Sequence, residues 1–159
     1  LDVVHVGDSR AYLWRDGELR QLTQDHSVVA ELVRRGSITP EDAETHPHRN
    51  VITRALGAEP EVVPDTVSEP LREGDVVLLC SDGLSSYVGA DEIARVLSRA
   101  TTLAEAARLL VERANAAGGA DNVTVVLARA GRPAARAAAA EPAGDDVPTG
   151  RTAEMRVLG

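Results

Sequence analysis

The sequence predicts an α+β domain built from antiparallel strands and a few helices. An Asp-Gly pair separates two short strand-like runs near the start, a continuous apolar run covers residues 76–80, and helical patterns occur between residues 93 and 114. A chain of 159 residues is long enough for one hydrophobic core and short for two. We therefore expect one folded domain.

The opening residues predict antiparallel sheet. Residues 1–6 are rich in Val, and residues 11–14 and 19–23 flank the pair Asp16-Gly17. Asp-Gly between two such runs is a strong signal for a two-residue hairpin turn. Because the chain begins inside a strand and without Met, we expect its true start to lie upstream of Leu1.

Residues 27–57 predict a long surface flap. Ser27 is suited to cap a short helix that ends at Gly36, and Thr39 followed by Pro is suited to begin a second helix. The rest of the segment is irregular and polar. Long segments of this kind in compact domains are usually functional.

The second half of the chain predicts further strands and two longer helices. Strands are expected near residues 61–67, 75–81 and 123–128, and the middle one is apolar throughout, which indicates a central place in the sheet. One helix is expected around residues 93–97. The next begins after Thr102, which forms a capping box with Glu105, and its apolar stripe comprises Leu103, Ala106, Leu110 and Ala114.

Composition divides the chain into two parts. Residues 1–130 carry the apolar patterns of a folded domain, with the flap at about 27–57. Residues 131–159 are rich in Ala, Pro and Arg and have few large apolar side chains. Such a segment has too little to bury, so we expect a disordered tail or linker.

Charge and cysteine content exclude several classes of protein. The formal net charge is −8 and no basic run interrupts it, so we expect no nucleic acid partner. Cys80 is the only cysteine, so no intrachain disulfide is available and a cytoplasmic location is expected. No apolar stretch approaches the roughly 20 residues that a membrane-spanning helix needs.

Three carboxylates occupy similar places in the predicted sheet. Asp8 follows the first strand, Asp82 follows the central strand, and Asp121 precedes the last strand. A single Asp beside Gly or Asn is most often a turn residue. Three carboxylates that converge at one edge would repel one another unless cations lay between them, and hard oxygen ligands suit Mg²⁺ or Mn²⁺.

Five short motifs occur in an order that is specific in combination, although each alone is weak. They are Gly7-Asp8-Ser9-Arg10-Ala11-Tyr12, Leu22-Thr23-Gln24-Asp25-His26-Ser27, Asn50-Val51-Ile52-Thr53-Arg54-Ala55-Leu56-Gly57, Cys80-Ser81-Asp82-Gly83-Leu84 and Asp121-Asn122-Val123-Thr124. In this order the chain resembles the metal-dependent protein serine/threonine phosphatases of type 2C (PPM), bacterial branch. The resemblance covers about residues 1–128 and makes the folded part the C-terminal part of such a domain.

The resemblance implies a fold and a reaction. The fold is an αββα four-layer sandwich of two antiparallel sheets flanked by helices, here without its N-terminal portion. The reaction is hydrolysis of phosphoserine and phosphothreonine in proteins by a water that bridges two Mg²⁺ or Mn²⁺ ions, and a third ion binds in bacterial members. The implied partners are phosphorylated proteins and the Ser/Thr protein kinases that produce them, and the implied state is a monomer.

The resemblance also assigns residues. Asp82 and Asp121 match the ligands of the first metal, and Asp8 with Asp82 matches the pair that holds the third metal. Asn122 would orient Asp121. Gly83, which follows Asp82 in the motif, and Asn50 at the base of the flap are expected to support the ligands from behind.

Two features of the family have no counterpart in this chain. These are an Asp-Gly pair that bridges both metals and an Arg that binds the phosphate, and both belong upstream of Leu1. We therefore expect the isolated chain to be inactive. The alternative is a non-catalytic regulatory or interaction module that keeps part of the phosphatase fold.

Other candidate residues have simpler explanations. A cysteine-dependent phosphatase needs Arg six positions after its nucleophile, and position 86 is Ser, so Cys80 is expected to be a buried structural thiol. Ser9 lacks the Gly-x-Ser-x-Gly motif and is expected to be a turn residue. His46 and His48 have no cysteine nearby and are expected to be exposed rather than metal-binding.

Three further side chains near the motifs are expected to be structural. Arg10 and Arg54 are suited to bind phosphate, but pairing of each with a carboxylate near the cleft is the favoured interpretation. His26 is expected to anchor the start of the flap.

Overall fold

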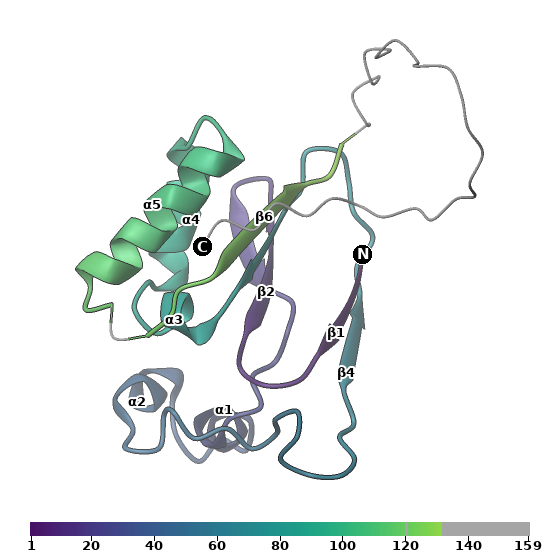
Figure 1. Ribbon diagram of the computed structural model, residues 1–159, viewed down its shortest axis with the longest axis vertical. Coiled ribbons are helices and arrows are strands. Elements are labelled where there is room, and N and C mark those ends of the chain that lie inside the picture. Colours follow the sequence, from purple (N-terminus) through teal and green to yellow (C-terminus); the bar gives the residue numbers. More distant parts are fainter. Residues whose placement is uncertain (120, 132–159) are drawn as a thin grey trace, which may run out of the picture.

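The computed structural model describes residues 1–119 and 121–131 (Figure 1). These residues form an α+β fold, as predicted. In chain order the elements are β1 (Asp2–His5), β2 (Arg10–Arg15), β3 (Glu18–Gln21), α1 (Val28–Arg34), α2 (Pro40–Thr45), β4 (Asp65–Ser68), β5 (Val76–Cys80), α3 (Asp82–Ser85), α4 (Ala90–Arg99), α5 (Leu103–Ala116) and β6 (Val125–Arg129).

The larger sheet has the order β3-β2-β5-β6 and is antiparallel throughout. Its β2–β3 hairpin turns at Asp16 and Gly17, whose φ angles of 52° and 87° match a turn that needs two left-handed residues. β5 lies inside the sheet between β2 and β6, which confirms the central place predicted from its apolar sequence.

Helices α4 and α5 cover one face of this sheet (Figure 1). Leu78 of β5, Ile93 of α4 and Leu110 of α5 are fully buried there. Thr102 caps α5 by accepting a hydrogen bond from the Glu105 backbone N–H at 3.1 Å. The Glu105 carboxylate, however, bonds the residue before the cap, Thr101, so the predicted capping box is formed only in part.

A two-stranded sheet of β1 and β4 crosses the other face of the larger sheet. Val3 and Val67 of this pair pack on a small cluster of Ala11, Leu13, Leu22 and Val77. The two antiparallel sheets are therefore confirmed. Within the described residues no helix covers the outer side of β1, where Val4 is 69% exposed.

Two strands are shorter than the sequence suggested, and one short helix was missed. β4 starts at Asp65 rather than near residue 61, because Pro64 has no N–H to give to a ladder. β6 starts at Val125 rather than at residue 123, since the preceding residues belong to a loop. α3 was not predicted, because four residues are too few to show a helical period.

The flap forms two short helices on a narrow base. Ser27 caps α1 and Thr39 caps α2, as the sequence predicted. The base is an antiparallel bridge between Ser27 and Ile52, with hydrogen bonds from the Thr53 N–H to the His26 carbonyl at 2.7 Å and from Val28 to Val51 at 2.9 Å. The tail predicted over 131–159 lies, except for residue 131, outside the described part. No described helix is long and apolar enough to cross a membrane.

Candidate metal site

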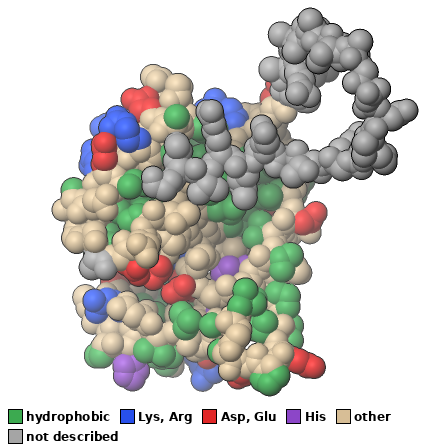
Figure 2. Space-filling model, viewed as in Figure 1, with side chains coloured by type: hydrophobic (Ala, Val, Ile, Leu, Met, Phe, Trp, Pro, Cys, Tyr) green, Lys and Arg blue, Asp and Glu red, His purple; other side chains and the backbone are tan. Residues whose placement is uncertain are grey.

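Asp8 and Asp82 lie close enough to interact electrostatically at the end of the sheet. Asp8 follows β1 after Gly7, whose φ of 108° reverses the chain, and Asp82 is the first residue of α3, directly after β5. Burial and then the negative charge of Asp82 raise the pKa of Asp8 above its ordinary value. Acidic side chains gather between α3 and the flap helices in Figure 2. The two strand ends thus form a pair of interacting carboxylates.

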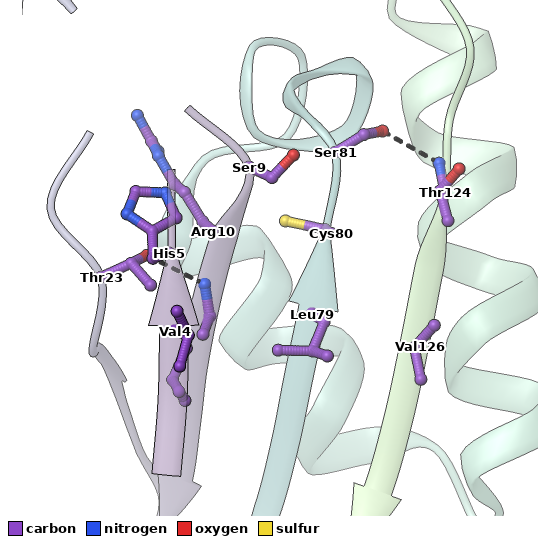
Figure 3. Close-up of a pocket in the computed structure, with 12 residues that line it drawn as sticks. Val4, His5, Ser9, Arg10, Thr23, Leu79, Cys80, Ser81, Thr124 and Val126 are labelled. Atoms are coloured by element: carbon purple, nitrogen blue, oxygen red, sulfur yellow. Dashed lines mark hydrogen bonds between the residues drawn. The ribbon is translucent and has the colours of Figure 1, made fainter. Parts of the chain in front are cut away.

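The Ser81 side chain, next to Asp82, binds the loop that carries Asp121. The Ser81 hydroxyl donates to the Asn122 carbonyl at 3.0 Å and accepts from the Thr124 N–H at 3.0 Å (Figure 3 shows the second contact). A methyl group at Gly83 would lie 2.4 Å from the Asn122 carbonyl oxygen, so only glycine fits there without a shift. Gly83 therefore supports the site by allowing this close approach.

The third predicted ligand does not join the pair. Asp121 is exposed, and its Oδ1 accepts a hydrogen bond from the Asn122 backbone N–H at 2.7 Å. Asn122 thus contacts Asp121 as expected, but through its main chain. Across residues 1–119 and 121–131, no three Asp, Glu, His or Cys side chains lie close enough together to hold a metal ion. Asn50 is exposed on the flap.

The donor set therefore fits a divalent cation only in part. Two carboxylates that repel each other at a strand edge are hard oxygen ligands, which Mg²⁺ and Mn²⁺ prefer. Asp121 sits on a loop that the Ser81 hydroxyl bonds beside Asp82, and its own carboxylate accepts from the Asn122 N–H. The role of these carboxylates as metal ligands stays a prediction.

Neither arginine near this site is free to bind phosphate. Arg10 donates to both carboxylate oxygens of Asp25, at 3.0 and 2.7 Å, and to the Tyr12 hydroxyl at 3.1 Å. Burial opposes its charge, but the hydrogen bonds with Asp25 raise its pKa overall. Arg54 donates to Asp65 at 2.7 Å. The predicted carboxylate pairing of both arginines is confirmed.

His26 joins the turn at Gly7, strand β4 and the base of the flap. Its Nδ1 accepts from the Gly7 backbone N–H at 3.0 Å, and its Nε2 lies 3.0 Å from Asp65 on β4. Since Nδ1 accepts, the ring proton of the neutral form lies on Nε2 and points at Asp65. The His26 backbone also bonds Gly7 and Thr53. His26 therefore anchors the flap, as predicted, and also holds the turn that carries Asp8, a role that the sequence did not indicate.

The remaining candidates are structural. Cys80 is 4% exposed, and burial raises the pKa of its thiol to about 11, so little thiolate exists at neutral pH. His46 and His48 have ring centroids 5.5 Å apart on the flap surface, and they form part of no described three-residue metal cluster. The burial of Cys80 and the exposure of His48 agree with the predictions, whereas His46 is half-buried.

The family can be decided from the sequence comparisons. The profile of the family "Stage II sporulation protein E (SpoIIE)" matches residues 16–131, which is most of the chain. Relatives that match are named bacterial serine/threonine phosphatases, and one solved structure that matches is named a PPM Ser-Thr phosphatase, from Mycobacterium smegmatis. The chain belongs to the PPM family of type 2C-like phosphatase domains.

One relative and two solved structures show the extent of the likeness. The serine/threonine phosphatase Stp of Listeria monocytogenes is 48% identical over 125 residues, covering 79% of this chain and 50% of its own. The crystal structure of the Mycobacterium tuberculosis phosphatase PstP/Ppp is 49% identical with a TM-score of 0.78, covering 82% of this chain and 55% of that one. A PstP catalytic domain in complex with 2 manganese ions is 48% identical with a TM-score of 0.73, at 80% and 52% coverage. This chain spans about half the length of its PPM relatives.

Proposed function

We propose that this chain supplies the Asp8–Asp82 side of a metal-dependent phosphatase site that hydrolyses phosphoserine and phosphothreonine in proteins. The observation that carries the proposal is the convergence of these two carboxylates, which burial and mutual repulsion disfavour in the absence of a cation. The proposal applies to a domain of the length that the PPM relatives have, since this chain spans about half of it.

The chain's own residues would fix the positions of the charged groups. Asp8 and Asp82 would bind one or more Mg²⁺ or Mn²⁺ ions, with Asp121 as a further ligand from the adjoining loop. When bound, such ions stabilise the charge that develops in phosphoryl transfer. Gly83 keeps the Asp121 loop against Asp82, and His26 keeps Gly7, and with it Asp8, against β4.

The same proposal extends to the substrates, the compartment and the oligomeric state. PPM relatives are named serine/threonine phosphatases, so we propose phosphorylated proteins as substrates and Ser/Thr protein kinases as the enzymes that produce them. We propose the cytoplasm as the compartment, because the only cysteine is a buried free thiol. We propose that the domain acts as a monomer.

Metal binding and turnover test the proposal separately. Addition of MnCl2 should raise the melting temperature of the chain, and Asp82→Asn should remove most of this rise. Asp16→Asn is the matched control, because Asp16 lies in the β2–β3 turn at the opposite end of β2 from Asp8 and Asn accepts its left-handed φ of 52°. In a chain extended to the relatives' length, Asp82→Asn should lower kcat on a phosphothreonine peptide by roughly a hundredfold. A folded Asp82→Asn variant with full turnover and an unchanged response to manganese would refute the proposal.

A second candidate is a non-catalytic regulatory or interaction module that keeps part of the fold. It is favoured by the finding that no three potential ligands converge within the described residues. The two candidates differ in the chain of full relative length, because a module would bind its partner without releasing phosphate from any phosphopeptide.

A further inference from the structure

A cavity of about 150 Å³ lies between the larger sheet and the connection from α4 to α5. One row of paired residues crosses it on three strands: Trp14 of β2 pairs with Val76 of β5, which pairs with Arg129 of β6. Paired residues of neighbouring strands direct their side chains to the same face of a sheet. Tyr12 and Leu78, two residues further along β2 and β5, belong to the core under α4 and α5, so the row points to the helices as well.

The cavity has an aromatic side chain on one side and an arginine on the other. Neighbouring strands lie about 4.8 Å apart, so two strand spacings, about 10 Å, separate the backbones of Trp14 and Arg129. Val76 between them is short and 4% exposed, and it forms the floor. The helix side is apolar and consists of Leu97, Ala100, Leu103 and Ala106. A cavity of this volume is large enough for a single six-membered ring.

The charge of the lining favours an anion. Arg129 lines the cavity, and no carboxylate of the described residues does. The two acidic groups of the adjoining segments are held elsewhere, since Asp75 binds Arg15 and Glu105 binds Thr101. Thr102, at the cavity's rim, accepts the Glu105 N–H with its hydroxyl oxygen, which leaves its O–H as a donor.

We infer that this cavity binds a small aromatic carboxylate, whose ring packs between Trp14 and the leucines of α4 and α5 and whose carboxylate accepts hydrogen bonds from Arg129 and Thr102. A guanidinium matches a carboxylate in charge and in its two-pronged geometry. A flat ring gains from stacking on an aromatic side chain, which a small inorganic anion does not. The cavity lies at the start of β5 and Asp82 follows its end, so the inference does not depend on the proposed function.

Trp14 reports on this site directly, because it is the only tryptophan of the chain. Titration of the full chain with benzoate should change its fluorescence in a saturable way at millimolar concentrations or below. Acetate carries the charge without the ring, and benzyl alcohol carries the ring without the charge. Each should bind roughly tenfold more weakly than benzoate or worse, because each leaves one side of the cavity without its contact.

Variants of Arg129 test the polar contact. Arg129→Gln should weaken benzoate binding by roughly tenfold or more, since it removes the charged donor. Arg129→Lys should retain part of the affinity, because it keeps the charge without the planar fork. Arg108→Gln is the matched control. Arg108 is an exposed arginine of α5 that pairs with Glu112 outside the cavity, so its loss should leave binding unchanged.

Three results would overturn the inference. The first is a fluorescence change that does not saturate, and the second is a response to benzyl alcohol equal to the response to benzoate. The third is an affinity that Arg129→Gln leaves unchanged in a folded variant. An affinity that rises when Met155→Ser and Leu158→Ser are introduced together would also overturn it, because the occupant would then be an apolar side chain of this chain's own tail. Manganese binding or turnover bears on none of these readouts.

Discussion

The two faces of the four-stranded sheet are covered by different means. On the helix side, α4 and α5 bury Tyr12, Leu78 and Cys80 in one continuous apolar cluster. On the opposite side, β1 and β4 cover only part of the sheet, and Leu79 remains 40% exposed. The candidate metal ligands Asp8 and Asp82 lie where these two layers meet, after β1 and β5 respectively.

Polar contacts replace apolar packing on the less covered side. His26 joins Gly7 to Asp65 at one end of the small sheet, and Arg15 joins Glu69 to Asp75 at the other, with contacts of 3.3 and 2.6 Å. Apolar packing resists deformation because every atom has neighbours, whereas a few hydrogen bonds fix positions without filling space. The part of the molecule that bears Asp8 is therefore held in position by polar contacts rather than by an apolar core.

The largest effect expected from this comparison is at neighbouring residues of β5. Leu78→Ala should lower the free energy of unfolding by about 2–5 kcal/mol, because it leaves a cavity in a fully buried site. Leu79→Ala should cost about 1 kcal/mol or less, since Leu79 is already 40% exposed. Urea unfolding of both variants measures the difference, and equal losses would show that the second face is as well packed as the first.

Gly83→Ala should follow in size and should act on the metal site. The added methyl group would meet the Asn122 carbonyl at 2.4 Å, so the loop bearing Asp121 must move away from Asp82. We expect a loss of about 1–3 kcal/mol of stability and a weaker response of the melting temperature to manganese. Gly89→Ala is the control, since a methyl group at Gly89 meets nothing within 4 Å. An unchanged manganese response in Gly83→Ala would separate Asp121 from the metal site.

These sites also show what the sequence could and could not predict. Local signals gave the Asp16-Gly17 turn, the Ser27, Thr39 and Thr102 caps and the central place of β5, because each depends on a few adjacent residues. The contact of Gly83 with Asn122 joins loops about 40 residues apart, and no local pattern specifies such a contact.

The residues of the candidate site were likewise predicted only in part. The places of Asp8 and Asp82 after strands indicated that they converge, and the charge of Asp82 does raise the pKa of Asp8, whereas their role as metal ligands is not tested by this interaction. The orientation of Asp121 depends on a hydrogen bond to the next residue's backbone, which competes with convergence and leaves no mark in the sequence. Arg15 likewise gains its role only from contact with the distant Asp75.

A smaller effect is expected from loss of the His26 side chain, which bonds Gly7 and Asp65. His26→Ala should cost about 1–2 kcal/mol, because the Gly7 N–H and the Asp65 carboxylate both lose a partner. His26→Asn should restore part of this loss, since its Oδ1 can accept from Gly7 in place of Nδ1. Hydrogen exchange at the Gly7 amide reports the contact directly, and exchange that stays equally slow in His26→Ala would mean that the ring does not hold this turn.

The smallest effect concerns the contact between Arg15 and Asp75 at the other end of the small sheet, and it depends on pH. Hydrogen bonds from Arg15 and then from the Arg72 backbone N–H lower the pKa of Asp75 to about 2, well below its ordinary value of 3.8. A carboxyl group whose pKa is lower in the folded state stabilises the fold above its unfolded pKa, and this contribution is lost as the pH falls from about 4 to about 2.

Asp75→Asn removes this titration while keeping the size of the side chain. Its free energy of unfolding should be lower than that of the wild type at pH 7, and it should change less between pH 4 and pH 2. Asp65→Asn is the informative comparison, because hydrogen bonds with His26 and then Arg54 also lower the pKa of Asp65 to about 2, but the Asp65 side chain is 43% exposed while that of Asp75 is 3% exposed. Solvent screens exposed pairs more strongly, so Asp65→Asn should flatten the curve less. Urea unfolding at half-unit pH steps gives both curves. If the free energy of unfolding of Asp75→Asn changed with pH as steeply as that of the wild type, the Arg15 contact would not connect the two layers in solution. His26 would then be the side chain that positions Asp8.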